Sequence, residues 1–372
     1  MQPEVYKLRS APTSSVSATR GIHIVNRTAR SVLKEMNMRT TTQLLLCSVL
    51  AGCAQVGEDG GRYYGGPDAG AGSATRTCDD LTSLPGDMTI TGTSGFTDLP
   101  TGCWELGGKL TLRGPAISSL DKLGDLRTVG SLEIDSTELS AIGTPSPINV
   151  TGDIAIHHNT KLVDISNVQP HGDLSSLMIE YNDVLPSLGG ISQATRVTGA
   201  TMIDSNPKLA AIDLSRATRL EGGLEIEDND ALTSIDLGDL TSVGNFTISH
   251  NVALTALKSL SSLQYVHGTL TVNDNDKLTG LDSMTSSMTS VDGSISITGN
   301  SALSSLGQLA HVGLVGGSVS ISSNANLDYC DPQPFTCCVQ IAGGLTISGN
   351  RSTSCQQHSW CWSNNTGCPF NN

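Results

Sequence analysis

An asparagine recurs nine times along this chain at intervals of 22 to 26 residues, each time inside the same short phrase. The clearest copies lie at 222–235 and 293–306 and read Gly-x-(Leu/Ile)-x-Ile-x-x-Asn-x-x-Leu-x-x-(Leu/Ile). A fixed period of this size indicates stacked structural units. Solenoids of this kind usually present a long surface rather than a chemical pocket. The nine asparagines are Asn159, Asn182, Asn206, Asn229, Asn251, Asn275, Asn300, Asn324 and Asn350.

Each unit combines two apolar spacings. Before the asparagine, apolar residues at i and i+2, such as Leu224 and Ile226, predict a strand with both side chains on one face. After it, apolar residues recur at every third position, which suits a chain that turns corners. A unit of about 24 residues is too short for a strand, a full helix and two loops, but it fits one coil of a flattened or triangular β-solenoid.

The second apolar strand position can be followed through twelve units, which predicts twelve rungs over residues 78–350. No single rung can bury its own apolar residues, so stacking has to make the core continuous. The predicted fold is an all-β parallel β-helix. The twelve positions are Ile90, Leu112, Ile134, Ile156, Ile179, Ile203, Ile226, Ile248, Val272, Ile297, Ile321 and Ile347.

A structural role is the favoured interpretation of the asparagines. Asparagine tolerates left-handed backbone geometry at a corner and hydrogen-bonds nearby backbone. Stacked in register, the amides can also bond to those above and below. A glycine precedes most strands and fits a second tight corner. These glycines are Gly130, Gly152, Gly222, Gly268, Gly293 and Gly317.

The phrase G-x-L-x-I-x-x-N-x-x-L-x-x-L resembles the receptor L-domain group, the β-helical relatives of leucine-rich repeats found in insulin-receptor-type ectodomains and fungal wall proteins. The resemblance covers roughly residues 78–350. The chain departs from that group because the first three rungs lack the asparagine and because it has more rungs than one such domain normally holds. The resemblance implies a right-handed β-helix and an extracellular recognition role, without naming a ligand.

The N-terminal region has the features of an exported protein. Residues 38–52 combine Arg39, a short apolar run and small residues, which is typical of a secretory signal peptide too short to span a bilayer. The segment 50–53 reads Leu-Ala-Gly-Cys and resembles a bacterial lipobox, which implies that Cys53 is lipidated and becomes the mature N-terminus. An ordinary signal peptide with a chance cysteine is the alternative. Residues 1–37 are basic and are expected not to be translated, although a transit peptide is a weaker possibility.

Residues 53–77 follow as a lipidated cysteine and a glycine-rich flexible tether. Ala54, rather than an aspartate, comes after Cys53. In the bacterial lipoproteins that this segment resembles, an aspartate directly after the lipidated cysteine is typical of retention at the inner membrane. The alanine at this position therefore implies the bacterial outer membrane or cell surface. The expected membrane contact is therefore a lipid anchor.

Eight cysteines remain after Cys53, an even number that is consistent with disulfides in an oxidising compartment. Cys78 and Cys103 bracket the first rung and predict an N-terminal staple. The others crowd the last rungs and residues 351–372, which predicts a cysteine-rich C-terminal cap with fifteen possible pairings. A zinc cluster near His358 is disfavoured because no C-x2-C pair occurs. The six cysteines are Cys330, Cys337, Cys338, Cys355, Cys361 and Cys368.

Charge argues against two classes of partner. Residues 1–52 hold seven of the 21 basic and two of the 35 acidic residues, so the rest of the chain has 14 basic and 33 acidic residues and a net charge of −19. Nucleic acid and anionic membrane surfaces attract positive charge. Neither is therefore expected as a partner.

No phosphate loop, H-E-x-x-H, G-x-S-x-G or EF-hand phrase occurs, so we expect no enzymatic activity, cofactor or metal. His157 and His158 could bind a metal, but a solvated corner is the favoured interpretation. The outward strand positions do carry stacked carboxylates, whose proximity could raise a pKa or hold a cation. A solvated acidic face is the simpler explanation. The candidate contact face consists of Asp135, Glu180, Asp204, Glu225 and Glu227.

The sequence therefore favours a non-enzymatic, lipid-anchored surface protein that binds a protein or an envelope polysaccharide. The alternative is a polysaccharide-active β-helix enzyme that uses Glu180, Asp204 and Glu227, since such enzymes need clustered carboxylates. The low aromatic content of 3% argues against a sugar-stacking groove.

Overall fold

The computed structural model describes residues 78, 80–258, 260–282, 288–307, 309, 312–328, 335 and 339–351. The predicted leader, Cys53 and the tether lie outside the described residues. So do the six C-terminal cysteines and, apart from Arg351, the predicted cap.

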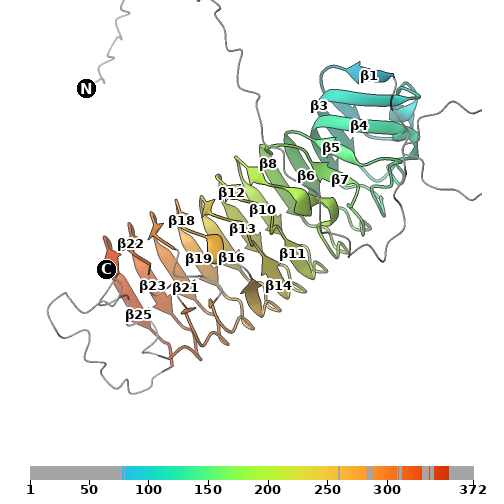
Figure 1. The fold of residues 1–372 in the computed structure, drawn as a ribbon. Helices are drawn as coiled ribbons and strands as arrows, with labels where there is room; N and C mark the ends of the chain where they lie inside the picture. The colour runs from blue at the N-terminus through green and yellow to red at the C-terminus, as the bar shows by residue number, and fades with distance from the viewer. Residues whose placement is uncertain are drawn as a thin grey trace, which may run out of the picture. The chain divides into compact units, whose positions relative to one another are not determined.

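Three parallel sheets form the coils of a β-solenoid. The main sheet has 15 strands, and its central path follows successive rungs from β1 to β25 (Figure 1). Its strands are β1 (Leu81–Leu84), β2 (Met88–Ile90), β3 (Cys103–Arg113), β4 (Asp125–Asp135), β5 (Ile148–Val150), β6 (Asp153–His157), β7 (Val168–Pro170), β8 (Ser176–Glu180), β10 (Thr201–Asp204), β13 (Leu224–Glu227), β16 (Phe246–Ser249), β19 (Leu270–Asn273), β21 (Ile295–Thr298), β23 (Val319–Ser322) and β25 (Leu345–Ser348).

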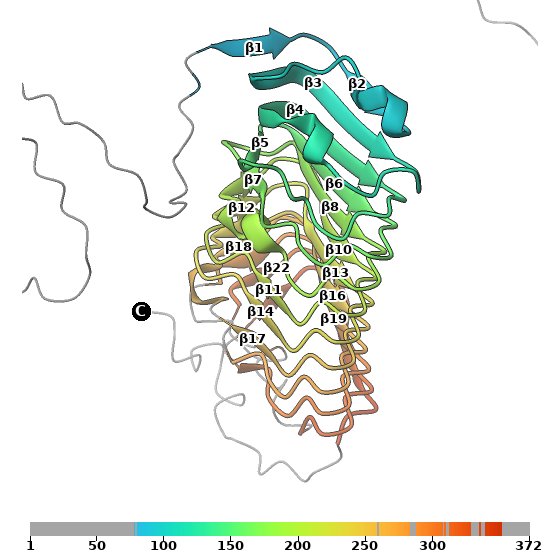
Figure 2. The same ribbon diagram turned by 90° about the vertical axis from the view of Figure 1, so that its right-hand side faces the viewer.

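Two smaller sheets line the other sides of the coils. Figure 2 shows β11, β14 and β17 along one side while β10, β13, β16 and β19 run along another. The seven-stranded sheet consists of β9 (Arg196–Val197), β12 (Arg219–Leu220), β15 (Ser242–Val243), β18 (Tyr265–Val266), β20 (Ser290–Val291), β22 (Leu314–Val315) and β24 (Gln340–Ile341). The three-stranded sheet consists of β11 (Ala211–Asp213), β14 (Ser234–Asp236) and β17 (Ala256–Lys258). Short 3-10 helices lie between strands, and those whose bounds fall within the described residues are η1 (Thr93–Phe96), η2 (Asp121–Leu123), η3 (Gly189–Gln193) and η4 (Leu260–Ser262).

The predicted register of the rungs is confirmed. Each of the twelve predicted positions pairs with the next along the main sheet, as Ile203 does with Ile226 and Ile226 with Ile248. Twelve rungs correspond to about 11 turns. Eleven of the twelve residues are buried, and Ile347 in the last rung is half-buried. The inward side chains thus form one continuous apolar core.

The asparagine ladder is also present, and its bonds explain why the amide is needed. Asn229 Nδ2 donates to the backbone oxygens of Ile203 (2.9 Å) and Glu227 (2.6 Å) and to Oδ1 of Asn251 (3.3 Å). Its Oδ1 accepts from the backbone nitrogen of Asn206. The same pattern repeats from Asn159 to Asn324, all of which are fully buried. A buried amide at this corner therefore satisfies backbone groups on two rungs.

One detail of the sequence interpretation was wrong, and the expectation for the glycines can be given its physical reason. The asparagines do not adopt the left-handed conformation; the residue before each of them does, as at His158 (φ 58°) and His250 (φ 57°). The glycines that precede the strands are required by close approach rather than by positive φ. A Cβ on Gly293 would lie 2.6 Å from the backbone oxygen of Gly268 in the rung before, which no side chain tolerates.

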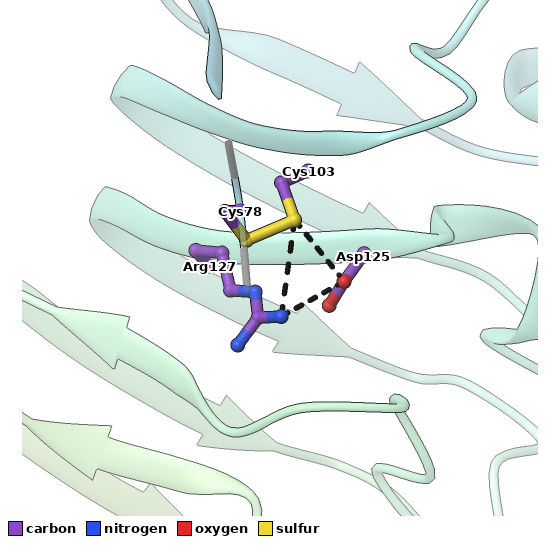
Figure 3. Close-up of a disulfide and its surroundings, with 4 residues drawn as sticks. All are labelled: Cys78, Cys103, Asp125 and Arg127. Carbon is purple, nitrogen blue, oxygen red and sulfur yellow. Dashed lines mark hydrogen bonds and ion pairs between the residues drawn. A yellow bond between two sulfur atoms is a disulfide. The ribbon is translucent and has the colours of Figure 1, made fainter. Parts of the chain in front are cut away.

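The predicted N-terminal staple is confirmed, because Cys78 and Cys103 form a disulfide. Cys103 begins β3, whose first residues pair with β1. In Figure 3 the side chains of Asp125 and Arg127 lie beside the disulfide, and Arg127 Nη2 donates to Asp125 Oδ2 at 2.9 Å. The disulfide thus ties residue 78 to the edge of the main sheet.

Candidate functional site

The outward face of the main sheet carries the charged residues that the sequence singled out. Adjacent rungs place Arg113, Asp135, His157, Glu180, Asp204 and Glu227 in consecutive paired positions. Glu225 lies one outward position earlier on β13. The row is continuous, as expected. Within the residues that the structure describes, its acidic side chains are paired with basic ones at the end near Arg113 but not at the end near Glu227.

At the N-terminal end, the acidic groups are paired with bases. Arg113 Nη2 lies 2.5 Å from Glu133 Oε1, and Arg113 Nε lies 2.8 Å from Asp135 Oδ2. Lys109 forms an ion pair with the other oxygen of Glu133. Burial acts to raise the pKa of Glu133, but its hydrogen bonds and charge interactions with Lys109 and Arg113 outweigh it and hold that pKa below the usual value.

Two histidines complete this N-terminal cluster. His157 Nδ1 lies 3.2 Å from Asp135 Oδ1, and His157 Nε2 lies 3.9 Å from Glu133 Oε1. His158 occupies the left-handed corner, so its ring turns back and its Nδ1 comes within 3.0 Å of His157 Nδ1. The His158 ring stacks on Tyr181 of the next rung, with centroids 5.0 Å apart and planes 2° from parallel.

Asp135 also has a lowered pKa. Burial acts to raise it, but the hydrogen bond from the Ser136 hydroxyl, together with the positive charges of His157 and Arg113, outweighs burial. Asp135 therefore belongs to the paired N-terminal cluster. The predicted contact face is divided at this point, because His157 separates Asp135 from Glu180.

The remaining four carboxylates form an uncompensated group, which we call the acidic row: Glu180, Asp204, Glu225 and Glu227. In the described part of the chain, no lysine or arginine forms an ion pair with any of them. Their contacts are with hydroxyls instead. Ser205 donates to Asp204 at 3.1 Å, and Ser249 donates to Glu227.

Burial, together with the charges of neighbouring carboxylates, raises the pKa of two members of the acidic row. Burial raises the pKa of Glu225, and the charges of Glu227 and Asp204 raise it further. Burial also raises the pKa of Asp204; the Ser205 hydroxyl acts against this, while the charges of Asp228 and Glu227 add to it. Carboxylates in this arrangement bind a positive ligand more readily than a neutral one because that ligand removes the repulsion.

A depression of about 360 Å³ lies beside the acidic row, and Glu225 lines it together with Met202, Gly223, Asn245 and Thr247. Asn245, one of its lining residues, lies in a shortened corner. Two residues separate Val243 from Phe246, whereas three separate Leu220 from Leu224 in the preceding rung.

From β16 onward the outward positions change character and carry small polar residues. The paired row continues through Ser249, Asn273, Thr298, Ser322 and Ser348. The charged part of the main sheet thus ends at β13.

Sequence reasoning missed Lys109 and Glu133. Both occupy outward positions of strands β3 and β4, and Glu133 pairs with Thr111 rather than with Lys109. A search for opposite charges in neighbouring rungs, offset by two residues along the strand, would have found them. Thr137 was also missed. It takes the asparagine position in the third rung and ends the ladder, donating its hydroxyl to Asn159 Oδ1 at 2.7 Å.

Among the described residues, no helix combines the length and apolar character that a membrane span requires. Neither the comparison with protein-family models nor that with curated proteins gives a match for this chain.

Proposed function

We propose that this protein is a non-enzymatic, lipid-anchored surface protein whose solenoid recognises a macromolecular partner through the acidic row. The single observation that carries the recognition proposal is the group of four carboxylates on β8, β10 and β13 with no basic partner among the described residues. Charge left uncompensated on a rigid sheet favours a partner that supplies the opposite charge.

The chemistry of the row favours a protein partner with exposed lysine or arginine side chains. Burial is the largest cause of the raised pKa values of Asp204 and Glu225, and the charges of neighbouring carboxylates add to it. A cationic partner would relieve this added repulsion. The extracellular recognition role implied by the resemblance to receptor L domains agrees with this assignment. The lipobox-like segment at 50–53 supports the address at a bacterial surface.

Binding of the mature chain to cell-envelope fractions would test this proposal. The test variant is Glu180→Gln/Asp204→Asn/Glu227→Gln, which removes three of the four charges of the acidic row but keeps the shape. The matched control is Asp213→Asn/Asp236→Asn/Asp239→Asn, which changes charge equally near the three-stranded sheet. We expect the test variant to lose capture and the control to keep it, with capture falling as salt rises. Equal capture by both variants would contradict the proposal.

The polysaccharide-active alternative has one specific observation in its favour. Glu225 has a raised pKa, lies beside Glu227 and lines the depression next to β13. A carboxyl group with a raised pKa can act as a general acid. Turnover of acidic or neutral polysaccharides by the wild type, lost both in Glu225→Gln and in the Glu180→Ala/Asp204→Ala/Glu227→Ala variant, would favour this alternative over recognition alone.

Labelling with a palmitate analogue would test the anchor separately. We expect incorporation into the wild-type chain and none into Cys53→Ser. Equal labelling of both would rule out lipidation at Cys53 without affecting the proposal for the acidic row.

A further inference from the structure

Three potential metal-ligand atoms meet at the N-terminal cluster: Asp135 Oδ1, His157 Nδ1 and His158 Nδ1. Their separations are 3.0 Å between the two nitrogens, 3.2 Å from His157 Nδ1 to Asp135 Oδ1, and 3.6 Å from His158 Nδ1 to the same oxygen. We propose that these residues bind a divalent transition-metal ion of the zinc class.

The triangle has the size that zinc requires. Zinc bound by imidazole nitrogen and carboxylate oxygen has bonds of about 2.0–2.2 Å in a tetrahedron, so its ligand atoms lie about 3.3 Å apart. The three observed separations scatter around that value. An ion about 2.05 Å from all three atoms would lie roughly 0.8 Å from their plane, close to the roughly 0.7 Å of a regular tetrahedron. The fourth position would face outward, where His158 is exposed.

The surroundings hold the ligands in place. Arg113 Nε lies 2.8 Å from Asp135 Oδ2, and the Ser136 hydroxyl donates to Oδ1 at 2.7 Å. A carboxylate oxygen has a second lone pair, which Oδ1 can offer to an ion beside the histidines. His157 Nε2 lies 3.9 Å from Glu133 Oε1, and a ligating histidine commonly directs its second nitrogen toward a carboxylate. The stacked Tyr181 ring holds the plane of His158. All three ligands therefore have a neighbour that orients them.

The fold explains why two adjacent residues can act together. His157 ends strand β6 and points outward, directly beside Asp135 of the previous rung. His158 then adopts positive φ at the corner, which turns its ring back toward His157. The choice of imidazole and carboxylate ligands favours zinc and its transition-metal neighbours over calcium or magnesium, which prefer oxygen ligands alone.

The chain supplies its own control. His250 occupies the same corner four rungs later, with φ 57°, and its Nε2 lies 3.6 Å from Asp274 Oδ2. The residue before it is Ser249, so the second imidazole is missing there. His250→Ala therefore removes a histidine and an acidic contact without touching the proposed site.

The experiment is a zinc chloride titration of the full chain after chelator treatment, followed by calorimetry and by metal analysis after dialysis. We expect His157→Ala and Asp135→Asn each to lose one equivalent of zinc or to bind it at least about 100-fold more weakly. Loss of a residue that only orients a ligand typically weakens metal binding by about 10–100-fold, so a larger effect indicates a direct ligand. His250→Ala should bind as the wild type does. Any zinc bound elsewhere on the chain is the same in the wild type and in each variant, so it does not affect the difference between them.

Cobalt provides a second readout that does not depend on stability. The wild type and His250→Ala should show cobalt d–d absorbance that is reduced in His157→Ala, and the difference spectrum should lack thiolate charge-transfer bands because no sulfur takes part. Circular dichroism would verify that each variant keeps its sheet content. Equal zinc stoichiometry and affinity in wild type, His157→Ala and Asp135→Asn would overturn the proposal, as would an equal loss in His250→Ala.

Discussion

Asn229 Nδ2 lies 3.3 Å from Asn251 Oδ1, one rung further along, and the same nitrogen donates to backbone oxygens of Ile203 and Glu227. One side chain thus joins its own rung to both neighbouring rungs. Because Ile203, Asn229 and Asn251 are fully buried, water cannot replace the bonds between them.

Asn229→Ala should therefore be strongly destabilising. Each buried polar group left without a partner costs about 1–3 kcal/mol. The substitution leaves at least two such groups without a partner, so we expect the free energy of unfolding to fall by about 3 kcal/mol or more. Urea unfolding followed by circular dichroism would measure it. Asp230→Ala, at the exposed next position, is the matched control and should cost less than about 0.5 kcal/mol. Similar losses in both variants would contradict the structural role of the ladder.

The glycine that precedes β21 provides a test of how closely the rungs approach. Gly293→Ala would place its Cβ 2.6 Å from Gly268 O, so the rungs would have to separate. We expect a loss of about 1–3 kcal/mol, as for other overpacked sites. Gly143→Ala is the control because nothing lies within 4 Å of its Cβ and its φ is not positive. A thermal scan that finds equal melting temperatures for the two variants would rule out the close approach.

Glu225→Gln should stabilise the fold near neutral pH. Because the folded-state pKa of Glu225 is raised, its contribution to stability is present below the unfolded-state pKa and is lost as the pH rises through the folded-state value. The ionised group therefore opposes folding at about pH 7, and the gain from glutamine should disappear in acid. The group is partly exposed, so the gain should stay below about 1 kcal/mol. A gain that is the same at every pH would contradict this prediction.

Glu133→Gln should have the opposite effect. The folded-state pKa of Glu133 is lowered by Lys109 and Arg113, so its contribution to stability is present above the unfolded-state pKa and is lost as the pH falls through the folded-state value. Chelator-treated protein should thus lose about 1 kcal/mol at neutral pH, and the difference should vanish in acid. Denaturant unfolding at several pH values would compare both glutamate variants, and a stabilising effect at neutral pH would contradict the pairing.

The Cys78–Cys103 disulfide should stabilise the N-terminal end of the solenoid. Its sequence separation is 25 residues, for which chain entropy gives about 3.5 kcal/mol. Peptide mapping without reduction should recover this pair. Cys78→Ala/Cys103→Ala should raise hydrogen exchange in β1 and β3 while leaving β19 and β21 protected, since each rung contacts mainly its neighbours. Unchanged exchange in β1 would show that the staple does not hold that strand.

The inward-facing part of the structure could be predicted because it repeats. Leu224 and Ile226 alternate with outward residues, and an asparagine three positions after the second apolar residue marks the same corner in nine of the twelve rungs. The rung order and register therefore follow from the spacing. A slip of one residue would turn the apolar side chains toward solvent, which makes that register the stable one. The disulfide between Cys78 and Cys103 could be predicted for a related reason, because the two cysteines lie on either side of the first rung.

Only the tertiary structure decided which outward groups meet. Lys109 reaches Glu133 across a rung boundary, and His158 turns back on His157 because the residue before the asparagine position, rather than the asparagine itself, is left-handed. Burial dictates the inward pattern and leaves a regular trace in the sequence. Long polar side chains meet according to reach and backbone direction, which the period alone does not encode. For that reason the sequence determined the rungs of this solenoid, whereas the tertiary structure separated the paired N-terminal cluster from the acidic row.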